Sequence, residues 1–259
     1  MPGEEGESKK PTASGLESLF SESLTVPEFK AWHPELYNSR GVRVRGYNFY
    51  EVLKRGGVPV LRRLAHCEQN VIAAVNNSFP VKMMISALRS SGCNFDLKRH
   101  VACEECADGV SCGYDPYNKQ IILCQDGVTS QKGVTTALLH ELIHMFDDCR
   151  AHVDFDNVDH LACTEIRAAN LAHCQTHMDA WWNGKASFFR RPGQHQQCVK
   201  EVAGYSLTML TGMSPAEAMT VLDRVFDRCY ADLEPFGRRF NINSWEPEHI
   251  YNQRRHYGY

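Results

Sequence analysis

The chain has 259 residues, a net charge of −3 at pH 7 and 43% hydrophobic residues. This charge balance argues against nucleic-acid binding, which needs a strongly basic surface. The hydrophobic content is ordinary for a globular protein, and the length allows one large core together with an extension. No apolar run approaches the roughly 18–20 residues that a membrane-spanning helix needs, so any membrane contact is expected to be peripheral.

The N-terminal part of the chain, residues 1–57, is predicted to be a flexible extension. Its first ten residues carry Glu4, Glu5 and Glu7, whereas import presequences are basic and poor in acidic residues. The apolar core of a secretory signal is missing as well. We therefore expect no cleavable presequence.

From residue 58 onwards the chain is predicted to be mainly helical, with one small sheet. Between Cys93 and Gln125, glycines and short apolar runs replace the helical pattern, which favours a small antiparallel sheet. Ser214 and Glu217 form a capping box with a proline at the first helical position, and so mark the start of a helix. The predicted helices span residues 58–77, 81–90, 134–149, 160–171, 194–210 and 214–230.

Residues 140–144 read His-Glu-Leu-Ile-His and fall inside the predicted helix 134–149. Because residues four apart share one face of a helix, His140 and His144 can bind the same metal ion. Glu141 projects at an adjacent angle, where its carboxylate can act as a base toward water. Two histidines and a glutamate in so apolar a helix are costly unless something satisfies them. The motif therefore predicts a zinc hydrolase site, in preference to a chance match.

A catalytic zinc ion usually has a third protein ligand. The residues after His144 lack the glycine and third histidine of the metzincin pattern. Glu165 is our preferred candidate, because it lies on the next predicted helix, which has room to pack back against the first. Asp147 is the alternative, although it lies too far along the helix axis to converge easily with both histidines. His152 and His160 are also available, as ligands or as groups that orient ligands.

Two further roles in a zinc peptidase have candidates in the sequence. In such enzymes an edge strand beside the metal helix holds the substrate backbone extended, and the best candidate is residues 120–125. An imidazole or cationic group should stabilise the oxyanion. His152, His160 and Arg167 are the candidates for that role.

The residues around the motif resemble the family of mitochondrial inner-membrane metalloproteases that assist ATP synthase assembly. The resemblance covers roughly Val81 to Gly237, well over half of the chain, and is specific because it runs through many separated segments. These segments are His140–Asp154, His160–Leu171, Ser91–Cys93, Cys103–Cys106, Gly113–Asp115, Ile121–Gln125, Gln197–Val199 and Cys229–Gly237.

The predicted fold is α+β: a mainly helical, zincin-like metalloprotease domain at 58–238 and a C-terminal tail at 239–259. By resemblance, His140 and His144 bind one zinc ion and Glu141 is the catalytic residue. The resemblance implies as substrate the precursor of a mitochondrially encoded ATP synthase subunit, and as partners the assembly intermediates of the membrane sector. The implied location is the intermembrane-space side of the inner membrane, with peripheral membrane contact.

The 11 cysteines are many for a reduced cytosolic protein. They could form disulfides, bind a second zinc ion through four of them, or stay free. We favour disulfides, because the four closely spaced cysteines lack the second close pair of a zinc ribbon and the intermembrane space oxidises imported cysteine-rich chains. The resembling family has ten of the positions, so Cys112 is the extra one, left free if the others form five bridges. The candidate zinc-binding cysteines are Cys103, Cys106, Cys112 and Cys124.

A second function is compatible with the same sequence. The chain could serve mainly as a non-proteolytic assembly chaperone or scaffold for ATP synthase subunits. The intact His-Glu-x-x-His motif argues against a dead enzyme. It does not argue against a second, non-proteolytic role.

Overall fold

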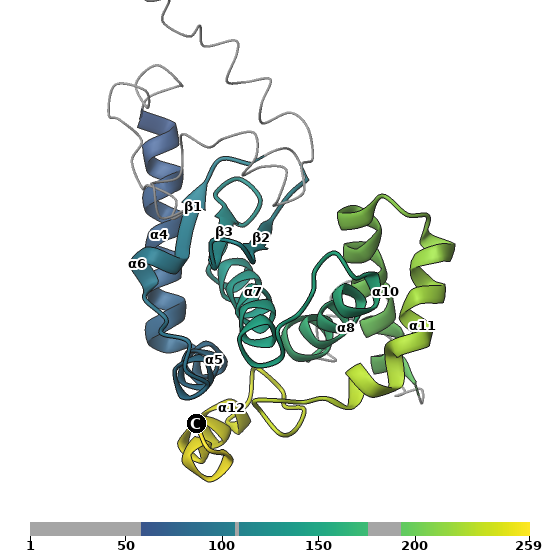
Figure 1. The fold of residues 1–259 in the computed structure, drawn as a ribbon. Coiled ribbons are helices and arrows are strands. Elements are labelled where there is room, and N and C mark those ends of the chain that lie inside the picture. Colours follow the sequence, from purple (N-terminus) through teal and green to yellow (C-terminus); the bar gives the residue numbers. More distant parts are fainter. Residues whose placement is uncertain (1–57, 107–108, 176–192) are drawn as a thin grey trace, which may run out of the picture.

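The computed structural model of the chain describes residues 58–106, 109–175 and 193–259 (Figure 1). The predicted extension at 1–57 lies outside these residues. The described part is mostly helical with one three-stranded sheet, which agrees with the predicted α+β class. In chain order the elements are α4 (Val58–Asn77), α5 (Phe79–Ser90), α6 (Leu97–His100), β1 (Val101–Glu104), β2 (Cys112–Asp115), β3 (Gln120–Cys124), α7 (Gln131–Ala151), α8 (Val158–Ala168), a π-helical turn (Ala169–His173), α10 (Gln194–Thr211), α11 (Pro215–Ala231), α12 (Glu246–Asn252) and a 3-10 turn (Arg254–Tyr257).

Helix α7 runs through the middle of the described part, with α4 and α5 on one side and α8, α10 and α11 on the other (Figure 1). Ser130 caps its start, because the Ser130 side chain accepts a hydrogen bond from the Gly133 amide. From Ala137 to Asp148 every residue of the helix is buried. A helix that is enclosed on all sides must satisfy its polar residues internally. The motif residues at 140–144 lie within this enclosed stretch.

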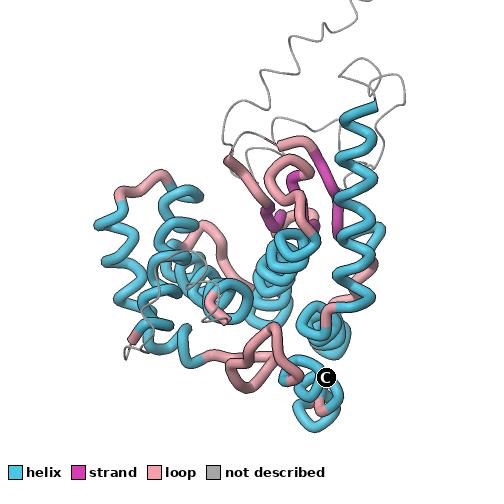
Figure 2. Tube along the Cα trace, turned by 180° about the vertical axis from the view of Figure 1, so that it is seen from behind, coloured by secondary structure: helices cyan, strands magenta, loops and turns pink. Residues whose placement is uncertain are grey.

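The sheet is mixed, and the prediction of an antiparallel sheet was wrong. Its strand order is β1-β3-β2, with β2 antiparallel and β1 parallel to β3. The chain forms β1, crosses to the far edge as β2, and returns as β3 between the two. Because successive strands alternate in direction, β3 runs parallel to β1. The sheet lies between α4 and α7 in both views (Figures 1 and 2).

This strand order also corrects the predicted substrate-binding strand. Gln120–Cys124 forms the central strand, and both of its edges are paired with neighbours. A strand with two partners has no free edge to offer to a peptide. The edge strands of the sheet are β1 and β2.

The six predicted helices are confirmed, with small shifts at their ends. The capping box of α11 is present: the Ser214 hydroxyl accepts from the Glu217 amide, and the Glu217 carboxylate accepts from the Ser214 amide. The helix predicted at 160–171 corresponds to α8, which ends at Ala168. The π-helical turn Ala169–His173 follows it directly. This turn was not predicted, because one wide turn leaves no mark in the hydrophobic periodicity.

Two hydrophobic clusters meet at the central helices. The first includes buried residues of α4, α5, the sheet and α7, and the second lies between α8, α10 and α11. Phe240 and Ile250, from the segment predicted as a tail at 239–259, are buried in the first cluster, where α12 packs on α5. The His-Glu-x-x-His motif lies on α7, and α8, which belongs to the second cluster, packs against α7.

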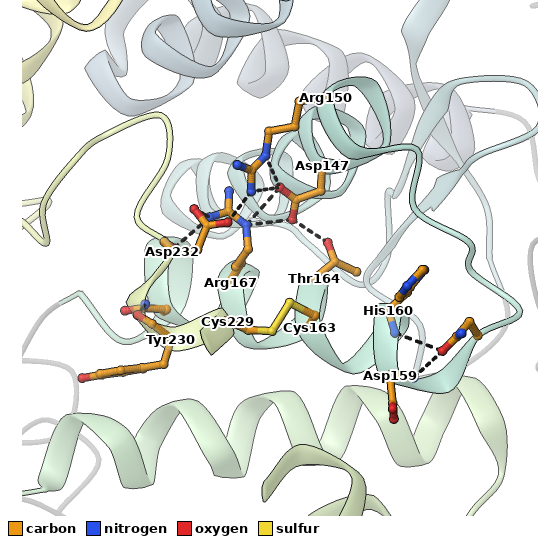
Figure 3. Close-up of a disulfide and its surroundings, with 12 residues drawn as sticks. Asp147, Arg150, Asp159, His160, Cys163, Thr164, Arg167, Cys229, Tyr230 and Asp232 are labelled. Atoms are coloured by element: carbon orange, nitrogen blue, oxygen red, sulfur yellow. Dashed lines mark hydrogen bonds and ion pairs between the residues drawn. A yellow bond between two sulfur atoms is a disulfide. The ribbon is translucent and has the colours of Figure 1, made fainter. Parts of the chain in front are cut away.

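Five disulfides join ten of the cysteines, and Cys112 is free. This outcome agrees with the expectation of five bridges and one extra thiol. The Cys163–Cys229 bridge ties α8 to α11 and so supports the helix that carries Glu165 (Figure 3). The five pairs are Cys67–Cys103, Cys93–Cys149, Cys106–Cys124, Cys163–Cys229 and Cys174–Cys198.

Among the described helices, none is by itself long and apolar enough to cross a membrane. Arg62–Asn77 and Phe79–Ser90 satisfy the length and composition criteria only as a pair, which bends by 78° at the break.

Candidate metal centre

The structure brings His140, His144 and Glu165 together. The Nε2 atoms of the two histidines lie 2.9 Å apart, because the residues are one helical turn apart on α7. The Glu165 carboxylate reaches them from α8, with Oε1 3.4 Å from His144 Nε2 and Oε2 3.6 Å from His140 Nε2. One ligand atom from each residue falls within 4.8 Å of the others. Two imidazole nitrogens and a carboxylate oxygen form a donor set suited to zinc.

The Glu165 carboxylate shows that this group fits a metal ion. Its side chain is only 2% exposed, and its Oε2 atom is buried without a hydrogen-bond partner among the described residues. An unsatisfied buried carboxylate oxygen is costly. A cation between Oε2 and the two histidines would remove this cost.

Burial changes the ionisation of the site residues. Burial lowers the pKa of His144 to about 4 and that of His140 well below its usual value, so both imidazoles are neutral at pH 7. Burial, with a contribution from the neighbouring Glu141 charge, raises the pKa of Glu165 to about 8. Burial likewise raises the pKa of Glu141 to about 7. Neutral imidazoles need no net loss of a proton to bind a metal, whereas Glu165 must first lose one.

We expect zinc affinity to rise with pH between about 6 and 8, because binding displaces the Glu165 proton. The pKa of about 8 places that proton on Glu165 at pH 7, while the His144 pKa of about 4 leaves the imidazole neutral throughout this range. Titration calorimetry at pH 7, in buffers of different ionisation enthalpy, should show that wild type releases about one proton more than Glu165→Gln. Equal proton release by the two proteins would contradict this role of Glu165.

Each histidine is also held through its other ring nitrogen. His144 Nδ1 lies 2.8 Å from the Thr164 hydroxyl, and His140 Nδ1 lies 3.0 Å from His173 Nε2. Thr164 comes from α8, one position before Glu165, and His173 comes from the π-helical turn. π-Helical turns occur frequently at functional sites. Neither residue was predicted; the only signal for Thr164 was its position beside Glu165.

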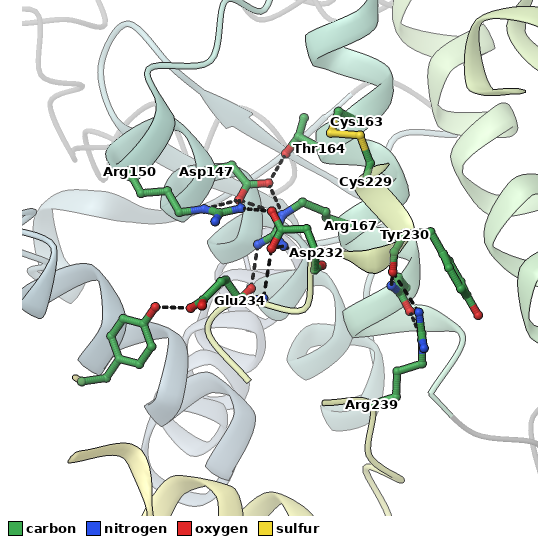
Figure 4. A network of polar contacts seen from close by, with 12 residues as sticks. Asp147, Arg150, Cys163, Thr164, Arg167, Cys229, Tyr230, Asp232, Glu234 and Arg239 are labelled. Atoms are coloured by element: carbon green, nitrogen blue, oxygen red, sulfur yellow. Dashed lines mark hydrogen bonds and ion pairs between the residues drawn. A yellow bond between two sulfur atoms is a disulfide. The ribbon is translucent and has the colours of Figure 1, made fainter. Parts of the chain in front are cut away.

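The alternative ligand Asp147 is not part of this group. Both of its carboxylate oxygens lie 2.9 Å from Arg167 Nε, and Arg150 Nη2 lies 3.1 Å from Oδ1 (Figure 4). These contacts turn Asp147 away from the Nε2 atoms of His140 and His144, as its distance along the helix axis suggested.

The candidates for oxyanion stabilisation do not join the group either. Arg167 contacts Asp147 and the carbonyl oxygens of Asp232 and Glu234. His152 ends α7 in a left-handed conformation, and the exposed His160 accepts a hydrogen bond from the Asp154 amide. These groups are thus used in helix ends, turns and ion pairs.

Glu141 lies beside the candidate metal-binding group and in contact with the sheet. It is 3% exposed, and the Cys112 side chain of β2 is its hydrogen-bond partner. Burial and the Glu141 charge raise the pKa of the Cys112 thiol well above its usual value, so the thiol stays protonated and can donate this bond. Edge strand β2 therefore borders the position of the candidate base.

These features define a class of protein: those in which a helix bearing His-Glu-x-x-His and a glutamate from the following helix surround one metal position. Residues 65–237 match the Peptidase M76 family, and the chain belongs to that family. The resemblance noted in the sequence is thereby confirmed.

Named relatives agree with this membership. Over 173 residues the chain is 42% identical to a Xenopus laevis protein named mitochondrial inner membrane protease ATP23 homolog, covering 66% of this chain and 72% of the relative. A Danio rerio protein of the same name is 40% identical over 200 residues, which are 74% of this chain and 78% of the relative. The mitochondrial inner membrane protease atp23 of Schizosaccharomyces pombe is 33% identical over 175 residues, 67% of this chain and 92% of the relative. No solved structure matches the chain.

Proposed function

We propose that the chain is a zinc metalloendopeptidase with a zincin-like domain that works at the mitochondrial inner membrane, on the intermembrane-space side. Its substrate is the precursor of a mitochondrially encoded ATP synthase subunit, and it also assists assembly of the membrane sector. The observation that carries the proposal is the convergence of His140, His144 and Glu165 beside Glu141. The names of the relatives support the location at the inner membrane, and the five disulfides suit an oxidising compartment.

The residues of the site have distinct roles in peptide hydrolysis. A bound zinc ion would polarise the scissile carbonyl and lower the pKa of water to about 7. His140, His144 and Glu165 would hold that ion, and Glu141 would take a proton from the attacking water and give it to the leaving amine. A pKa of about 7 lets Glu141 accept and release a proton near neutral pH.

We propose that the substrate backbone pairs with the free edge of β2. Among the residues that the structure describes, this strand has one partner, β3, and its Cys112 side chain contacts Glu141. A peptide added at this edge would lie extended past the candidate base. Strand β1, the other edge strand, lies on the side of the sheet nearer to α4 (Figure 1).

A complementation experiment tests the proposed function and separates it from a chaperone role. Cells that lack their own member of the family would receive the wild-type chain or Glu141→Gln. We expect wild type to restore both processing of the precursor and assembly of the membrane sector, and Glu141→Gln to restore assembly alone. If wild type leaves the precursor unprocessed but restores assembly, the protease proposal fails and the chain is an assembly chaperone.

A further inference from the structure

A chain of buried polar contacts leads from the candidate metal centre to the ion pair between α7 and α8. His144 Nδ1 lies 2.8 Å from the Thr164 hydroxyl, which donates to Asp147 Oδ2 at 2.9 Å. Asp147 in turn accepts from Arg167 Nε at 2.9 Å (Figures 3 and 4). Thr164, Asp147 and Arg167 are each at most 3% exposed. Water therefore does not compete for these contacts.

The direction of each hydrogen bond follows from the chemistry of the groups. A guanidinium group only donates, and the carboxylate of Asp147, which lies between Arg167 and Arg150, only accepts. Thr164 has a single hydroxyl proton, which is donated to Asp147. Toward His144 the Thr164 oxygen can then only accept, so His144 Nδ1 must carry a hydrogen.

This direction fixes the state of the atom that faces the metal position. A neutral imidazole carries one N–H, so with a hydrogen on Nδ1 the Nε2 atom of His144 has a free lone pair. That Nε2 atom lies 3.4 Å from Glu165 Oε1 and 2.9 Å from His140 Nε2. The latter contact is consistent with this state, because His140 can donate its own Nε2 hydrogen to His144.

His140 has a different kind of support. Its Nδ1 atom lies 3.0 Å from His173 Nε2, and an imidazole partner can either donate or accept. The His140 tautomer can therefore change when a metal ion binds. Of the two histidines, His144 is the one whose hydrogen bond has a direction fixed by a buried charge, that of Asp147.

We propose that Thr164 is a positioning residue. Its hydroxyl donates to the Asp147 carboxylate and therefore accepts from His144 Nδ1, which fixes the His144 tautomer with an unprotonated Nε2 before any metal binds. Orientation of a metal-binding histidine by a partner on its other nitrogen typically contributes 10–100-fold to metal affinity. The tautomer inference stands on the contacts alone, and the effect on zinc rests on the proposed function.

Thr164→Val, which removes the hydroxyl but keeps the shape, and Thr164→Ser, which restores it, test the proposal. The matched control is Thr135→Val, because the Thr135 hydroxyl on α7 bonds the Gln131 carbonyl and not a histidine. The full chain with intact disulfides would be labelled with ¹⁵N-histidine for NMR at neutral pH before zinc is added. Zinc affinity would then be measured by competition with a chelator.

We expect His144 to be protonated at Nδ1 in wild type and in Thr164→Ser and Thr135→Val, and to lose this preference in Thr164→Val. Zinc affinity should fall about 10–100-fold in Thr164→Val only. A hydrogen on Nε2 of His144 in wild type would overturn the proposal, even if Thr164→Val fails to fold. An equal loss of affinity in Thr164→Ser would overturn it too. If wild type shows the Nδ1 tautomer but binds no zinc, the proposed function fails and the tautomer inference survives.

Discussion

Replacing Glu141 by glutamine should strongly slow peptide cleavage while the protein keeps its fold and its capacity to bind a metal ion. Glutamine has the shape of glutamate but cannot take up a proton, and general acid–base catalysis typically contributes about 10²–10⁴ to the rate. We therefore expect kcat to fall by about that factor. Thermal unfolding should occur at an equal or higher temperature, because burial of the charged form is costly, as the raised Glu141 pKa of about 7 indicates.

The matched control for Glu141→Gln is Glu201→Gln on α10. Glu201 is exposed and contacts Gln197, one turn earlier on the same helix. The Glu201→Gln variant should cleave a fluorogenic peptide at the wild-type rate. Cleavage by Glu141→Gln at a rate close to that of this control would refute the role of Glu141 as the base.

Replacing Asp147 by alanine should lower the free energy of unfolding by about 3–5 kcal/mol, as expected when one partner of a buried ion pair is removed. Arg167 is 1% exposed, and Asp147 is bonded to it through both carboxylate oxygens. Without Asp147 the guanidinium group keeps, within the described part of the chain, the Asp232 carboxylate and two backbone carbonyls as partners. Denaturant unfolding with the disulfides intact measures the change.

The control for this prediction is an exposed ion pair. Asp223 pairs with Lys200 at 2.5 Å, and the Asp223 side chain is 59% exposed. Asp223→Ala should cost about 0–1 kcal/mol. If the cost of Asp147→Ala were no larger than this, the buried network would not hold α7 against α8.

The sequence predicted that His140, His144 and Glu165 lie together, because the positions of these residues follow simple periodicities. Four-residue spacing on a helix placed His140 and His144 on one face, and the structure has that arrangement. Glu165 could be chosen because a following helix often packs back against its predecessor, and α8 does so. Helix positions were predictable because amphipathic patterns and caps, such as the capping box at Ser214, are local features.

The features that were not predicted depend on contacts between distant segments. The alternation of apolar residues identifies a strand but not its neighbours, so the parallel pairing of β1 with β3 could not be derived. The π-helical turn that brings His173 to His140 has no local signature. The contact between Cys112 and Glu141 arises only when β2 packs on α7.

The central claim is that His140, His144 and Glu165 form one zinc site, and metal analysis of the purified full chain tests it most directly. Elemental mass spectrometry of wild type should find one zinc ion per chain, and the double variant His140→Ala/His144→Ala should retain none. His160→Ala, which removes an exposed imidazole outside the group, should retain one. A wild-type chain that takes up no zinc, or a double variant that binds as much as wild type, would contradict the account.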